Sequence, residues 1–194
     1  MTNRRWRVAL LAVPLLLGGC AGAQAETMAA DHSMGDVATG HQTQPGGQAA
    51  TGDAPPERAA MVCDDEISDE LTQILRLDAP AHTVTSWDGQ VFTCTYHLPM
   101  GPLVLQVNVS GSKKEAGAFF DARAAELPQA EKTVGLGERA IRTDTGVVVV
   151  VKDDMTLTVD GTGLPEVFGA NGQRRSALAF EVASDILGCW TQHE

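Results

Sequence analysis

The chain lacks an apolar run long enough to cross a membrane, and it is poor in basic residues. Its longest apolar run covers only residues 8–17, whereas a membrane-spanning helix needs about 20 residues. Lysine and arginine together number 14 against 25 acidic residues, which gives a formal net charge of -11. An acidic surface repels nucleic acid and anionic lipid headgroups. We therefore expect no nucleic acid among the partners.

Cysteine and recognisable catalytic motifs are also scarce. The chain has 4 cysteines, and Cys63, Cys94 and Cys189 lie much farther apart than the two to four residues that separate the ligands of a zinc knuckle. No serine lies in a Gly-x-Ser-x-Gly sequence, and Gly135-x-Gly137 is too short for a phosphate-binding loop. These absences predict a protein that is not an enzyme.

The first residues indicate export. A short arginine-rich stretch precedes the apolar run at 8–17, and small residues follow the run, as in a secretory signal. The sequence Leu17-Gly18-Gly19-Cys20 resembles the lipobox of bacterial lipoproteins. This resemblance implies removal of residues 1–19, lipid attached to Cys20, and a protein anchored to the membrane in the cell envelope, facing outside the cytoplasm. The alternative is an ordinary secretory signal that is cut near residues 23–25.

The segment after the lipobox has the composition of a tether. Residues 21–60 contain almost no large aliphatic residues and no aromatic ones, so they bury too little apolar surface to offset the entropy lost on ordering. We predict a disordered tether that starts at the lipidated cysteine and covers residues 20–60. Within it lie thioether and imidazole groups, which suit copper, at Met28, His32, Met34 and His41. Scattered histidines and methionines are equally typical of a linker, so copper binding is an alternative function.

Residues 61–194 have the length of one domain. Apolar residues at helical spacing predict helices, and runs of alternating or continuous apolar residues between turn sequences predict strands. The expected order is a helix, three strands, a helix, three strands and a helix. It predicts an α+β fold, with an antiparallel sheet of about six strands and helices packed on one face. The expected ranges are 64–77, 82–87, 91–98, 103–110, 112–127, 140–143, 147–152, 156–160 and 174–190.

Two of the expected strands differ in pattern. In residues 103–110 apolar and polar residues alternate, which predicts a strand with one covered side. The five consecutive valines at 147–151 instead predict a strand that is buried on both faces. Between these strands, Ser112 and Glu115 have the spacing of a capping box at a helix start.

The residues from Cys63 onward resemble a group of small actinobacterial lipoproteins that is largely without assigned activity. The resemblance rests on a cysteine before the first helix, the Cys-x-aromatic strand at 93–96, and the Gly-Leu-Gly-acidic-x-Ala turn within 134–140. It implies a compact α+β domain with a disulfide between Cys63 and Cys94, but the pattern does not require Cys189. From the residues alone, pairing of Cys63 with Cys94 and pairing with Cys189 both remain open.

Together these features predict a lipid-anchored, extracytoplasmic binding protein. The partner would be another envelope protein, a small ligand or a wall component. The sheet face that helices leave uncovered is the first place to look for the binding surface. A large apolar patch there would favour a protein or lipid partner, whereas a polar face would weaken that idea.

Overall fold

The computed structural model describes residues 54–169 and 171–192. Its helices are α1 (Glu57–Ala60), the 3-10 turn η1 (Met61–Cys63), α2 (Asp65–Leu75), α3 (Lys113–Ala125) and α4 (Arg175–Gln192). Its strands are β1 (His82–Trp87), β2 (Val91–Leu98), β3 (Gly101–Val109), β4 (Glu131–Thr133), β5 (Arg139–Arg142), β6 (Val147–Lys152), β7 (Met155–Asp160), β8 (Val167–Phe168) and β9 (Gln173–Arg174). None of the described helices is long and apolar enough to span a membrane.

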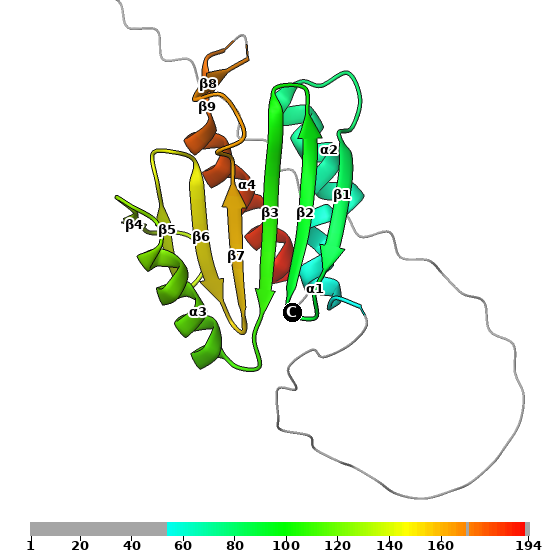
Figure 1. The fold of residues 1–194 in the computed structure, drawn as a ribbon. Coiled ribbons are helices and arrows are strands. Elements are labelled where there is room, and N and C mark those ends of the chain that lie inside the picture. Colours follow the sequence, from blue (N-terminus) through cyan, green and yellow to red (C-terminus); the bar gives the residue numbers. More distant parts are fainter. Residues whose placement is uncertain (1–53, 170, 193–194) are drawn as a thin grey trace, which may run out of the picture. The chain divides into compact units, whose positions relative to one another are not determined.

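The main sheet has seven strands in the order β1-β2-β3-β7-β6-β5-β4, and every neighbouring pair is antiparallel. The chain forms β1, β2 and β3 as a meander, crosses the sheet through α3, and restarts with β4 at the far edge (Figure 1). It then returns strand by strand until β7 pairs with β3. The expected α+β fold with an antiparallel sheet is confirmed.

A tight hairpin turn joins β1 to β2, which pair antiparallel. The Asp88 carboxylate accepts the backbone N–H groups of Gln90 at 2.9 Å and Val91 at 2.6 Å. Gly89 adopts φ +95°, a conformation that glycine reaches without steric cost. The two backbone hydrogen bonds lower the pKa of the Asp88 carboxyl, because they favour its charged form.

The start of α3 carries the expected cap. The Ser112 hydroxyl accepts the backbone N–H of Glu115 at 3.3 Å, and the Glu115 carboxylate accepts the backbone N–H of Gly111 at 2.9 Å. These bonds satisfy donors that a helix start otherwise leaves unpaired. They also fix the point at which the chain leaves β3 to cross the sheet.

The helices do not all pack on one face, so that part of the expected architecture is wrong. In Figure 1, α2 and α4 lie behind the sheet, and α3 lies in front of β5 and β6. The strand count also differs, because β4 adds an edge strand and β8 pairs with β9 in a separate two-stranded sheet. An amphipathic helix pattern predicts one buried side, but it does not encode which face of the sheet receives that side.

Helices on both faces divide the apolar interior into two cores. The larger core lies between the sheet and α1, α2 and α4, and the smaller one lies under α3. The valine run of β6 contributes to both: Val148 and Val150 belong to the larger core, and Val147, Val149 and Val151 to the smaller. All five are at most 4% exposed. The prediction that this strand is buried on both faces is confirmed.

The chain enters the folded part through a covalently fixed segment. Helix α1 covers residues 57–60, at the end of the stretch that composition assigns to the tether, and its Ala59 is fully buried. Just after it, a disulfide joins Cys63 to Cys94, as the family resemblance implies, with the two Cα atoms 5.7 Å apart. The Tyr96 hydroxyl donates to the Val62 carbonyl at 2.9 Å. These two links hold η1 against β2. Burial also raises the pKa of the Tyr96 hydroxyl.

Candidate functional site

Helix α3 covers only one half of its side of the sheet. On that side, no described helix lies over β1, β2 and β3, as Figure 1 shows. Because the strands pair in register, His82 lies opposite His97 and Val84 lies opposite Thr95. We call this surface the open face. Its side chains come from His82, Val84, Ser86, Thr93, Thr95, His97, Val104 and Gln106.

The open face is polar. Among the described residues, the exposed large hydrophobic side chains are Val84, Val134 and Val167. They lie on β1, in the loop after β4 and on β8, so they form no continuous apolar patch. Protein and lipid partners usually select such a patch. The described residues of the open face therefore offer polar groups rather than an apolar patch.

A small hollow lies where the open face meets α3. Its volume is about 220 Å³, which is below the 300–1,000 Å³ that is usual for sites of drug-sized ligands. We call it the α3 hollow. Its lining combines the β1–β2 turn and residues of β2, β3 and β7 with two side chains of α3: Asp88, Val91, Thr93, Gln106, Asn108, Phe119, Arg123, Thr156 and Thr158. A hollow of this size and polarity suits a small polar molecule.

Asn108 is the most unusual residue of this lining. It is only 2% exposed, and its Oδ1 accepts the Ser110 hydroxyl at 3.0 Å. Within the described part of the chain, its buried Nδ2 atom has no hydrogen-bond partner. A buried donor without a partner costs about 1–3 kcal/mol. An acceptor that reached this amide would offset that cost.

Sequence reasoning did not single out this site. The alternation in residues 103–110 places Asn108 on the polar side of its strand, together with Gln106 and Ser110. A signal was available, because asparagine is depleted in strands. The hollow itself depends on where α3 crosses the sheet, which no local pattern encodes.

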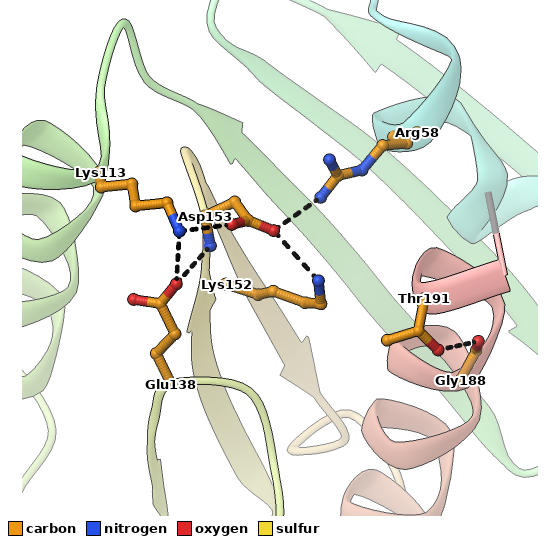
Figure 2. Close-up of polar contacts among 7 residues, drawn as sticks. All are labelled: Arg58, Lys113, Glu138, Lys152, Asp153, Gly188 and Thr191. Atoms are coloured by element: carbon orange, nitrogen blue, oxygen red, sulfur yellow. Dashed lines mark hydrogen bonds and ion pairs between the residues drawn. The ribbon is translucent and has the colours of Figure 1, made fainter. Parts of the chain in front are cut away.

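A cluster of charged side chains lies at the β6–β7 turn (Figure 2). The Asp153 carboxylate contacts the Nζ atoms of Lys113 at 2.7 Å and Lys152 at 3.0 Å, and it lies 3.6 Å from Nη2 of Arg58. Lys113 also donates to Glu138 at 3.1 Å. These contacts hold the pKa of Asp153 well below its usual range and raise that of Lys113.

The charges of this cluster mostly neutralise one another. The cluster joins α1, the start of α3, the turn before β5 and the β6–β7 hairpin. Beside it, a second hollow of about 480 Å³ lies between the turn at 135–138 and α4, where the Thr191 hydroxyl donates to the Gly188 carbonyl at 2.7 Å (Figure 2). Because each charged group already faces an opposite charge, we interpret the cluster as a structural clamp.

Most of the other expected ligand groups fall in the part of the chain that the structure does not describe. Cys20, Met28, His32, Met34 and His41 lie outside the described residues, so lipid attachment and copper binding stay predictions. Within residues 54–169 and 171–192, no group of three or more His, Cys, Asp or Glu residues is placed to hold a metal ion. Cys63 and Cys94 form the disulfide already described, and Cys189 is buried in α4.

Asp185 on α4 makes stability depend on pH. Burial, together with the nearby charges of Glu70 and Glu181, raises the pKa of its carboxyl to about 6. Because the folded pKa exceeds the unfolded value near 3.9, the ionised carboxylate destabilises the fold at pH 7, and stability should rise as the pH falls from 7 toward 4. We expect Asp185→Asn to stabilise the protein by about 1 kcal/mol at pH 7, since the half-buried site is partly screened by water.

Urea unfolding at pH 7 and pH 4 would measure this effect. The advantage of Asp185→Asn over the unmodified protein should shrink at the lower pH, where the native carboxyl is protonated as well. The matched control is Asp69→Asn, at an exposed position of α2. An equal gain at both pH values would contradict the assignment to Asp185.

The chain was compared with protein families, with curated proteins and with solved structures. No family model, no curated protein and no solved structure matches the chain.

Proposed function

We propose that this protein is a lipid-anchored binding protein of the cell envelope, which presents its domain outside the cytoplasm and takes a small polar ligand at the α3 hollow. The observation that carries the binding part is the hollow itself, which is lined by hydroxyl, amide and guanidinium groups and by Asn108, whose buried Nδ2 has no partner among the described residues. The polar character of the open face supports a small ligand rather than an envelope protein.

The anchoring part of the proposal rests on the sequence. The lipobox-like residues before Cys20 supply the attachment point, and two or more acyl chains hold a protein stably on a membrane. The predicted tether would let the domain reach away from the headgroups. A role in binding without catalysis agrees with the lack of recognisable catalytic motifs in the sequence.

Native mass spectrometry of the full chain, extracted from its own membranes, tests the binding part. We expect an added mass that is lost in Thr158→Leu, because the larger side chain fills the hollow that Thr158 lines. The matched control is Thr85→Leu, at an exposed position of β1 outside the hollow. The proposal fails if the unmodified protein carries no added mass, or if both variants retain it equally.

A further inference from the structure

We infer that the α3 hollow binds the carboxylate of a small organic acid, with Arg123 and Asn108 as its hydrogen-bond donors. This inference rests on the proposed binding function and names the ligand class. The two donors come from different parts of the fold, Arg123 from α3 and Asn108 from β3. A carboxylate bridging them would join the helix to the sheet.

The guanidinium of Arg123 supplies the positive charge. Its Nη1 atom donates to the Glu126 carboxylate at 2.8 Å, one helical turn away. That bond uses one of the five N–H groups that an arginine presents in a planar fork. Its side chain is 28% exposed and lines the hollow. Because charge-assisted hydrogen bonds are the strong ones, the remaining N–H groups favour an anionic oxygen.

Asn108 supplies the neutral donor at the buried side. Its Nδ2 atom has less than 1 Å² of accessible surface and no partner among the described residues. Close by in the lining, the Thr93 hydroxyl accepts the Gln106 amide at a long 3.4 Å, so this hydroxyl keeps its own proton to donate. Arg123, Asn108 and Thr93 therefore offer side-chain donors to a carboxylate, which has several lone pairs, whereas the Thr156 hydroxyl already donates to the Ala116 carbonyl at 3.2 Å.

Asp88 is the one acidic side chain of the lining. Its Oδ1 atom already accepts two backbone N–H groups of the β1–β2 turn, which offsets part of its charge. A ligand that also carries an ammonium group would meet this carboxylate, as an α-amino acid does. The volume of about 220 Å³ equals that of about seven waters in the liquid, which gives room for a small organic acid.

The chain has few asparagines, so the side-chain amide of Asn108 can be observed selectively by NMR. The only asparagines are Asn3, Asn108 and Asn171, so labelling asparagine side chains with ¹⁵N gives a few amide signals. We would titrate the full chain in detergent with alanine, propionate and alaninamide. Alanine and propionate carry the carboxylate, and alaninamide lacks it. We expect alanine and propionate to shift the Asn108 signals to saturation, while alaninamide leaves them in place and Asn171 does not respond.

A variant pair tests the role of the guanidinium. Arg123→Gln should weaken the binding of alanine roughly 10- to 100-fold, because it removes a charge-assisted hydrogen bond. The matched control is Arg174→Gln: Arg174 pairs with Glu166 at 3.8 Å outside the hollow, so affinity should not change. Saturation by alanine alone still supports a carboxylate site and adds Asp88 as the partner of the ammonium group.

The inference is overturned by any of three results. These are equal shifts with alaninamide, unchanged affinity in Arg123→Gln, or no saturation by either acid up to about 10 mM, which corresponds to a very weak complex. If no acid binds but the extracted protein still carries a mass that Thr158→Leu removes, the ligand class is wrong and the proposed function stands.

Discussion

Cys20→Ala is expected to move nearly all of the protein from the membrane to the soluble fraction. The thiol of Cys20 is the predicted site of diacylglyceryl transfer, and each buried CH₂ of an acyl chain contributes about 0.8 kcal/mol to membrane binding. Loss of the two chains on the thiol removes most of this free energy. Fractionation of cells, with intact mass of the protein in each fraction, measures both the location and the lipid.

A second cysteine provides the control for this result. Cys189→Ala removes a thiol that is buried in the folded domain, so this variant should stay in the membrane fraction and keep its lipid mass. Membrane retention of Cys20→Ala would refute the lipobox interpretation. A soluble, lipid-free unmodified protein would refute it too, and it would favour the ordinary secretory signal.

Replacement of Cys63 and Cys94 by alanine is expected to lower the free energy of unfolding by about 3–4 kcal/mol. Their separation of 31 residues gives a closed loop for which the chain-entropy model predicts a loss of this size. Cys94 is fully buried in the larger core, so alanine also leaves a small void. Urea unfolding followed by circular dichroism would measure the change.

Reduction provides the matched control for the disulfide. Dithiothreitol should lower the unfolding midpoint of the unmodified protein and leave that of the double variant unchanged. Hydrogen exchange should rise first in η1, because the bond from the Tyr96 hydroxyl to the Val62 carbonyl is then the main remaining side-chain link to β2. Equal midpoints before and after reduction would show that the disulfide contributes little.

Much of the fold could be predicted from local patterns. Helices α2, α3 and α4 and the strands β1–β3 and β5–β7 lie within a few residues of the predicted ranges, because apolar spacing reports which side of each element is buried. Helix α1 was missed, because its residues have the composition of a tether. The apolar patterns of two strands also indicate that the helices do not all lie on one face of the sheet. Five buried valines in β6 require cover on both sides, whereas the alternation in β3 requires cover on one side only. Read together, the two strands describe a sheet that α3 covers only in part.

Features that depend on long-range placement could not be predicted. Strand β4 consists of Glu131, Lys132 and Thr133, and such a short charged sequence is typical of a protected sheet edge rather than of a recognisable strand. The α3 hollow and the cluster around Asp153 join residues that lie far apart in the chain. Their geometry follows from the crossing of α3, and neither site has a sequence motif of its own.

The links at η1 also have a mechanical consequence. If Cys20 holds the protein on a membrane, a pulling force on the domain enters through the chain just before α1. The disulfide between Cys63 and Cys94 passes this force directly into β2, which is hydrogen-bonded on both sides within the sheet. Helix α2 follows Cys63 in the chain and so lies outside the loaded path. The disulfide therefore makes the domain resist unfolding that starts from its N-terminal side.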